Sequence, residues 1–209
     1  MTLDPDRPMY RWRELAPEQQ RVLLDHRRAN RLPWHSPPHF QSDTAYYMVT
    51  AACYEHQHVI GASETRMLDF EQKLVETASA HSIELFAWNL LPNHYHLLLA
   101  TLDVKRLLWE LGRLHGRSSF DWNGEDDRRK RKVWCNVAET AMKSERHFWA
   151  SLNYVLHNAV RHGYVQHWLD WPYCNAEQYL EQVGRDVALR RWKAYPLYDY
   201  GKDWDPPDF

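Results

Sequence analysis

The sequence predicts an α+β fold: a central antiparallel sheet of the ferredoxin-like, split βαβ kind, followed by one extra helix. The first observation behind this is the order of the expected elements: strand, helix, strand, strand, helix, strand. The second is the length of 209 residues with 44% hydrophobic residues, which suits one well-buried core. The third is the proline-rich character of both ends, which indicates extensions on either side of this core. We therefore expect an N-terminal extension at 1–40, a core domain at 41–166 and an aromatic, proline-rich tail at 167–209.

The first part of the chain supplies an appended helix, a strand and a second helix. The appended helix is expected to begin at 16–18 and to end near residue 29, before three prolines impose an extended link. Aromatic and β-branched residues predict a strand over 44–53. A helix should begin at 63–66 and end near residue 81, because its apolar residues recur at helical spacing.

The middle of the chain predicts a hairpin and a helix. Residues 83–90 and 94–101 form the two strands, and 91–93 form the turn between them. Asp103 then caps a helix. The apolar residues of that helix recur at helical spacing: Val104, Leu107, Leu108, Leu111 and Leu114.

The last elements complete the sheet and add the extra helix. The polar segment 119–131 is expected to be a mobile loop, and 133–137 the fourth strand. A helix over 144–162 should begin at a serine cap and stop at Gly163. A short helix is expected near 176–192 in the tail.

Composition excludes several classes of protein. Cys53, Cys135 and Cys174 are far apart and form no C-x-x-C pair, so the chain encodes neither a zinc ribbon nor a disulfide framework. No stretch approaches the ~18 apolar residues of a membrane span, and the first residues have no apolar run typical of secretion. We therefore expect a cytoplasmic protein with no membrane partner. The net charge of −2 leaves any nucleic-acid binding to local basic clusters.

Two histidines lie one pleat apart on the expected strand 94–101. Residues i and i+2 of a strand point to the same face, so His94 and His96 should project side by side, with Tyr95 on the opposite face. Two imidazoles held on rigid backbone are half of a divalent metal site. A third ligand, with an oxygen or nitrogen donor, must come from elsewhere in the fold.

The helix expected at 144–162 offers that third ligand. Tyr154 and Asn158 are i, i+4 neighbours on one face of this helix. Packed beside the histidine strand, the helix would present a phenol and an amide oxygen to the same metal. Its apolar stripe, which should face the sheet, consists of Phe148, Leu152, Val155, Leu156 and Ala159.

These residues resemble a known family. The segment 92–99, Pro-Asn-His-Tyr-His-Leu-Leu-Leu, resembles the HUH motif (histidine, bulky hydrophobe, histidine) of single-tyrosine transposases, in the form found in REP-associated tyrosine transposases. The segment 152–165 is similar to the nucleophile helix of that family, which carries Tyr-x-x-x-Asn. The resemblance covers roughly residues 40–181. The chain departs from the family at Ala159, which usually is proline, and at 135–142, which usually contains Asp-Arg.

The resemblance implies a DNA transposase that cuts single-stranded DNA near hairpins or palindromic repeats and rejoins the strands through a 5′-phosphotyrosine intermediate. His94, His96 and Asn158 would bind Mg²⁺ or Mn²⁺, and Tyr154 would be the nucleophile. Such a metal would polarise the scissile phosphate. The covalent link would conserve the energy of the phosphodiester, so resealing would need no nucleotide cofactor. The expected partner is hairpin-containing single-stranded DNA, bound by a monomer or a homodimer.

Several basic residues become candidate contacts to the DNA backbone once phosphate chemistry is expected. They include an unbroken run of five. The candidates are Arg113, Arg117, Arg128, Arg129, Lys130, Arg131, Lys132 and Arg161.

Three other classes of protein share part of this pattern. Histidine-triad nucleotide hydrolases need a third histidine where this chain has Leu98, and a zinc hydrolase with a helical H-E-x-x-H motif is excluded because no such motif occurs. The third alternative stays open: a domesticated relative that binds hairpin DNA or RNA without cutting it.

Overall fold

The structure is a computed structural model that describes residues 16–19, 21–22, 25, 45–198 and 200. The described residues between 17 and 25 are helical. The rest of the helix predicted at 16–29, and the proline-rich link after it, lie outside the described residues.

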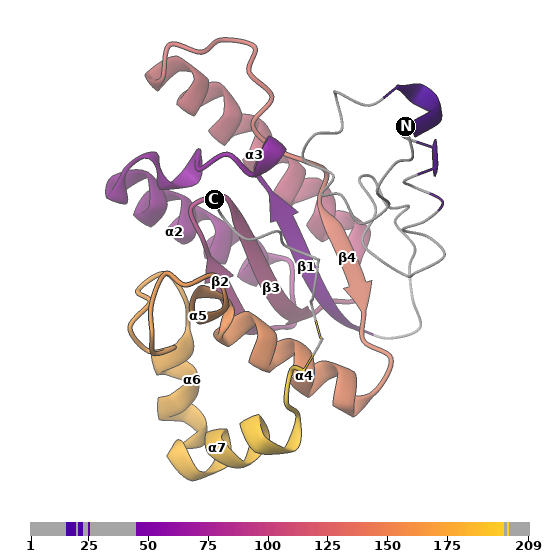
Figure 1. The fold of residues 1–209 in the computed structure, drawn as a ribbon, viewed down its shortest axis with the longest axis vertical. Coiled ribbons are helices and arrows are strands. Elements are labelled where there is room, and N and C mark those ends of the chain that lie inside the picture. Colours follow the sequence, from indigo (N-terminus) through magenta and orange to yellow (C-terminus); the bar gives the residue numbers. More distant parts are fainter. Residues whose placement is uncertain (1–15, 20, 23–24, 26–44, 199, 201–209) are drawn as a thin grey trace.

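A four-stranded antiparallel sheet forms the centre of the fold (Figure 1). Its strands are β1 (Tyr46–Ala52), β2 (Glu84–Leu90), β3 (His94–Ala100) and β4 (Ala138–Ala141), in the order β2-β3-β1-β4. β1 and β2 flank β3 and run antiparallel to it, as the split βαβ arrangement requires. The predicted α+β class is therefore confirmed, and so is the hairpin of β2 and β3.

Two helices cover one face of the sheet, on the far side in Figure 1. They are α2 (Glu64–Ala80) and α3 (Val104–Glu125). Each begins as predicted, at a side-chain cap: Ser63 accepts a hydrogen bond from the amide of Arg66, and Asp103 accepts one from the amide of Arg106. The core between these helices and the sheet includes the sheet residues Tyr47, Val49, Tyr95, Leu97 and Leu99.

The helices that follow β4 pack on the other face. They are α4 (Glu145–Leu156), α5 (Asn158–Arg161), α6 (Ala176–Val183) and α7 (Arg185–Ala194). The predicted apolar stripe does face the sheet: a second core joins Met48, Ala87 and Leu98 of the strands to Leu152, Val155 and Leu156 of α4. Among the described residues, no helix combines the length and the apolar character that a membrane crossing requires.

The loop predicted at 119–131 is wrong for its first seven residues, because α3 continues to Glu125. Trp122 is buried in the core against Phe70, with ring centroids 5.2 Å apart, so this polar stretch has one apolar anchor. The buried guanidinium of Arg66 pairs with Glu125 and with Asp126 at 2.7 Å, which ties the end of α3 to α2. This polar segment thus remains helical because buried Trp122 and the ion pair of Glu125 with Arg66 hold it against other elements.

The fourth strand lies at 138–141 and not at 133–137. Val133, Trp134 and Val137 are buried, but this segment makes only an isolated bridge, between Trp134 and Cys53, the residue that follows β1. Its apolar side chains fill the core instead of pairing as a ladder. Two short 3₁₀ turns, η2 (Tyr54–His56) and η3 (Ile60–Ala62), connect β1 to α2.

The two predicted C-terminal helices are each divided. Between α4 and α5, His157 leaves helical geometry with φ −102° and ψ 10°, and burial lowers the pKa of its imidazole to about 4. Gly184 separates α6 from α7 at φ 78°, a conformation that favours glycine. The predicted stop at Gly163 has φ 77° and donates its amide hydrogen to the carbonyl of Val160.

A buried aromatic cluster holds β3 from the face opposite its histidines. The hydroxyl of Tyr95 lies 3.1 Å from Nε2 of His115, and the His115 ring stacks on Trp134 with centroids 4.1 Å apart and planes at 8°. Burial lowers the pKa of His115 to about 3, so its imidazole is neutral near pH 7. This cluster fixes which face of β3 turns toward α4.

Replacement of His115 by phenylalanine should change the pH dependence of stability. The unfolded chain binds a proton near pH 6.5 and the folded one only near pH 3, so the native protein loses stability as the pH falls through this window. His115→Phe should remove up to about 1.4 kcal/mol per pH unit of that loss. It should also cost about 1–3 kcal/mol at pH 7.5, because the Tyr95 hydroxyl loses its partner.

Urea unfolding followed by circular dichroism between pH 4 and 7.5 measures both effects. If the free energies of unfolding of the two proteins change in parallel over this pH range, His115 titrates normally.

Candidate functional site

The two histidines of β3 lie side by side on the face that α4 covers. His94 and His96 are both buried, with ring centroids 5.1 Å apart and planes at 75°. Tyr95, between them, points into the opposite core. The alternation of a strand places two imidazoles on one rigid surface.

Each imidazole is oriented by a hydrogen bond at Nδ1. Asn93 donates from its amide nitrogen to the carbonyl of His56, so its amide oxygen faces Nδ1 of His94 at 2.6 Å. That oxygen can only accept, so Nδ1 of His94 carries the proton and Nε2 carries a lone pair. Nδ1 of His96 forms a hydrogen bond with the hydroxyl of Thr50, at 2.8 Å, in which either group can be the donor. Such outer partners orient histidines that ligate metals through Nε2.

Asn158 completes a donor set that fits a divalent cation. Its amide oxygen lies 3.1 Å from Nε2 of His94, so two lone-pair atoms face each other. Ligands about 2.1 Å from one cation in octahedral geometry are about 3.0 Å apart, close to this separation. Among the described residues, no three histidine, cysteine or acidic side chains are grouped to hold a metal. A metal here therefore needs the amide oxygen of Asn158 beside His94 and His96.

Tyr154 lies against the second histidine. Its side chain is fully buried, and its ring contacts that of His96 edge to face, with centroids 5.0 Å apart. The guanidinium of Arg161 lies 5.5 Å from the Tyr154 ring, which places a cation beside the phenol. On a third side the ring of Tyr200 is 5.8 Å away, and the Tyr200 hydroxyl pairs with that of Ser151 at 2.6 Å.

The helix that carries Tyr154 is held to the sheet by a hydrogen bond from a side-chain amide. The side-chain nitrogen of Asn89, on β2, donates to the carbonyl of Val155 at 3.0 Å, and Asn89 is the neighbour of His96 in the register of the sheet. The amides of His157 and His162 bond four residues back, so helical spacing continues across the division between α4 and α5. Tyr154 and Asn158 therefore stay on one stripe.

Three further side chains that were not predicted from the sequence meet this site. Thr50 and Asn93 are the partners of the two Nδ1 atoms. His162 lies one turn beyond Asn158, and its ring centroid is 4.8 Å from that of His94. The i, i+4 spacing from Asn158 was a usable signal for His162. Thr50 could be found only from the register of β1 against β3.

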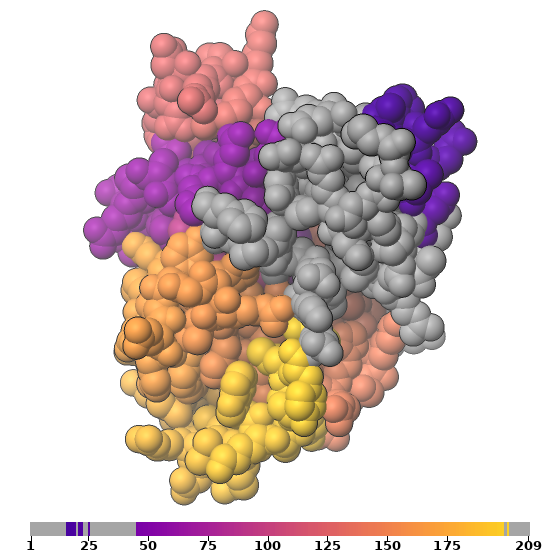
Figure 2. Space-filling model, in the orientation of Figure 1, coloured from indigo at the N-terminus to yellow at the C-terminus, as the bar shows by residue number. Residues whose placement is uncertain are grey.

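The predicted basic run lies on the turn after α3, which protrudes from the rest of the surface in Figure 2. Arg131 pairs with Asp126 at 2.7 Å, and Arg129 donates to the carbonyl of Phe120, so both hold the end of α3. The Lys132 ammonium lies 4.3 Å from the centroid of the Tyr54 ring. Tyr54 is two residues before His56, whose carbonyl accepts the hydrogen bond from Asn93. The exposed members of the run are Arg128, Arg129, Lys130 and Lys132.

Two of the predicted basic residues lie on the other layer of the fold. Arg113 and Arg117 belong to α3, which covers the face opposite His94. Arg113 pairs with Glu110 at 3.2 Å and stacks on Trp109. The structure therefore brings Arg161 to Tyr154, and places these two on the opposite layer.

Comparison with known proteins gives one informative similarity. No protein-family model matches the chain, and no curated protein matches it. Among solved structures, the chain is similar to a REP-associated tyrosine transposase bound to a REP hairpin, with a TM-score of 0.53 and 19% sequence identity. The similarity covers 83% of this chain and 94% of that chain, so the two share a fold over nearly the whole of the transposase.

The bond between Thr50 and His96 predicts a measurable effect on metal binding. Thr50→Val keeps a β-branched residue on β1 but removes the hydroxyl that holds Nδ1 of His96. Loss of such an outer partner should weaken Mn²⁺ binding about 10–100-fold. Isothermal titration calorimetry measures this, with Thr140→Val on β4 as the matched control. Equal Mn²⁺ affinities for Thr50→Val and wild type would exclude His96 as an oriented ligand.

Proposed function

We propose that this protein is a metal-dependent transposase that cuts and rejoins single-stranded DNA, with Tyr154 as its nucleophile. One observation carries the proposal: the helix of Tyr154 and Asn158 packs on the strand of His94 and His96, so a phenol and three candidate cation ligands lie together. A tyrosine beside a divalent cation is suited to attack on a phosphodiester. The fold shared with a tyrosine transposase agrees with this assignment.

The three donors would hold Mg²⁺ or Mn²⁺. Two imidazole nitrogens and one amide oxygen leave positions for water and for a phosphate oxygen, as both ions accept. When bound, the ion supplies positive charge at the phosphate oxygens, where negative charge develops during displacement.

The cleavage step exchanges one ester bond for another. The Tyr154 oxygen attacks phosphorus, the bond from phosphorus to O3′ breaks, and the 5′ phosphate becomes esterified to the tyrosine. The phenol loses its proton and the departing 3′ oxygen gains one, so the products are a phosphotyrosine and a 3′-hydroxyl. The reverse attack by a 3′-hydroxyl rejoins the strand without an external energy source. Arg161, beside the Tyr154 ring, would offer a positive charge to the phosphate.

The proposed partner is hairpin-containing single-stranded DNA. The structurally similar transposase is bound to a REP hairpin. In this chain, Lys132 and the exposed basic residues of the turn after α3 offer contacts to phosphates. Such contacts position a strand without reading its sequence.

One observation favours a second function, the binding of hairpin DNA or RNA without cleavage. Tyr154 is fully buried, beside Tyr200 and Arg161, so no phosphate reaches its hydroxyl until neighbouring side chains move. A protein that only binds would tolerate this burial.

Replacement of the nucleophile separates the two functions. Tyr154→Phe should abolish the covalent protein–DNA adduct with a pool of single-stranded hairpin oligonucleotides and Mg²⁺, and leave their binding nearly unchanged. Denaturing gels detect the adduct, and fluorescence anisotropy measures binding. Tyr173→Phe, at a buried tyrosine of the other core, is the matched control. An adduct that persists in Tyr154→Phe would rule out this nucleophile.

Metal removal tests the cation site separately. A chelator should stop cleavage, because the negative charge that develops at the phosphate would no longer be stabilised. Added Mg²⁺ or Mn²⁺ should restore cleavage. Single-turnover cleavage rates measure the effect. Full activity in chelator would contradict the metal role of His94, His96 and Asn158.

A further inference from the structure

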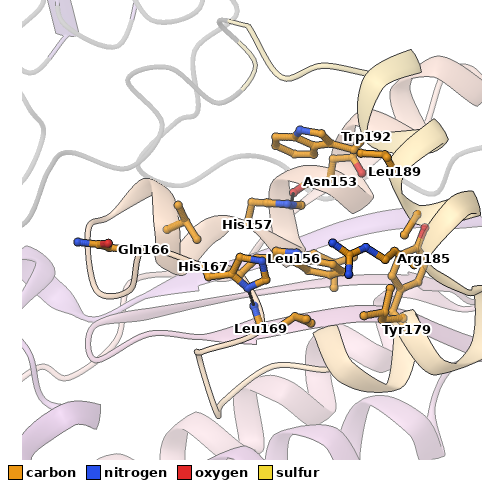
Figure 3. Close-up of a pocket in the computed structure, with 14 residues that line it drawn as sticks. Asn153, Leu156, His157, Gln166, His167, Leu169, Tyr179, Arg185, Leu189 and Trp192 are labelled. Carbon is orange, nitrogen blue, oxygen red and sulfur yellow. Dashed lines mark hydrogen bonds between the residues drawn. The ribbon is translucent and has the colours of Figure 1, made fainter.

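A cavity of about 400 Å³ lies beside the nucleophile helix and has no part in the site described above. One wall is a stripe of α4 and α5 with the spacing i, i+3, i+4, i+7, formed by Asn153, Leu156, His157 and Val160. The other walls come from residues 166–169, α6 and α7 (Figure 3). Its volume is within the range of about 300–1,000 Å³ that is typical of small-ligand sites.

Stacked aromatic rings form much of the lining. The ring of His157 lies between those of Trp168 and Trp192, with centroid distances of 5.0 and 3.8 Å and interplanar angles of 17° and 24°. Tyr179 adds a further ring to the lining. The two stacks cover both faces of the His157 ring, so a base would stack on the outer face of the half-buried Trp168 or Trp192. Flat rings bind nucleobases in this way with little dependence on which base is bound.

The charge in the cavity favours an anionic ligand. The side chain of Arg185 reaches from the start of α7 into the cavity (Figure 3). None of the described residues that line the cavity is an aspartate or a glutamate. A guanidinium without a competing carboxylate in the lining is suited to a phosphate. Ring and charge together match a nucleotide, which is both flat and anionic.

The position of the cavity agrees with a strand bound at the proposed active site. The stripe that lines it is adjacent, on the same helix, to the stripe of Tyr154 and Asn158. Neighbouring faces of a helix are separated by no more than its diameter of about 10 Å. A strand with one phosphate at Tyr154 can therefore reach the cavity within the next nucleotides.

We propose that this cavity binds an unpaired nucleotide next to the cleaved phosphodiester, with its base on the aromatic wall and its phosphate on Arg185. The cavity would hold the strand flanking the cleavage point while the scissile phosphate lies at Tyr154. The position along the strand rests on the proposed function, whereas the binding of a nucleotide rests on the cavity alone.

The test measures binding without chemistry. Single-stranded pentanucleotides that carry one central 2-aminopurine are titrated with the full-length Tyr154→Phe protein in chelator, and quenching of 2-aminopurine reports stacking. Saturable quenching is expected in all four flanking-base contexts. The cavity-filling variant Ala188→Phe and the charge variant Arg185→Gln, both in the Tyr154→Phe background, should each weaken binding about tenfold.

Arg190→Gln is the matched control, because it removes an exposed charge from the same helix at a residue outside the lining. It should leave the affinity unchanged. The Arg185 side chain is exposed, so its replacement keeps the test valid even if Ala188→Phe fails to fold. Equal affinities in Arg185→Gln, Arg190→Gln and their Tyr154→Phe parent, or an absence of quenching in the parent, would overturn the proposal.

The two proposals fail in different ways. If quenching in the Tyr154→Phe protein depends on Arg185 but wild type never forms a covalent adduct, the nucleotide site is supported and the transposase chemistry is refuted. Cleavage by wild type without such quenching in Tyr154→Phe refutes the nucleotide site alone.

Discussion

The contact between β3 and the helix of α4 and α5 is the interaction on which the rest of this structure depends. His94 meets Asn158 at 3.1 Å, and the ring of His96 meets that of Tyr154 at 5.0 Å. The two elements are about sixty residues apart in the chain, so the fold alone brings the four side chains together. Their burial keeps water from competing for the same polar atoms. A small shift of the helix would separate the amide oxygen from the imidazole.

The surrounding structure limits such a shift from both sides. Behind β3, the bond from Tyr95 to His115 and the stack on Trp134 fix the strand. In front, the bond from Asn89 to the carbonyl of Val155 fixes the helix on β2. Thr50 and Asn93 then orient the imidazoles through hydrogen bonds at their Nδ1 atoms. The result is a preorganised donor set of the kind that metal-dependent catalysis requires.

The sequence predicted the parts of this arrangement that follow from local periodicity. The period of two placed His94 and His96 on one face, and the helical period placed Tyr154 above Asn158. Periodicity cannot show which strand lies next to which. Thr50 is a partner of His96 only through the register of β1 and β3. Asn89 can donate a hydrogen bond to the Val155 carbonyl only because β2 packs against α4. These residues were therefore not predicted.

The errors in the predicted fold have the same origin. The polar character of residues 119–131 predicted a loop, but α3 continues to Glu125, because Arg66 of another helix pairs with its end and Trp122 anchors it in the core. The apolar residues 133–137 predicted a strand, but they are used to fill the core. In both segments tertiary contacts override the local pattern. The predicted DNA contacts Arg113 and Arg117 lie on the far layer for a related reason, since the sequence does not say which face α3 covers.

Identification of the modified residue tests the central claim most directly. The protein is incubated with a pool of single-stranded hairpin oligonucleotides and Mn²⁺, digested with protease and nuclease, and analysed by mass spectrometry. The account predicts a nucleotide phosphate on the peptide that contains Tyr154, and on no other tyrosine peptide. A phosphate on a different tyrosine, or no modified peptide while the DNA is cut, would contradict it.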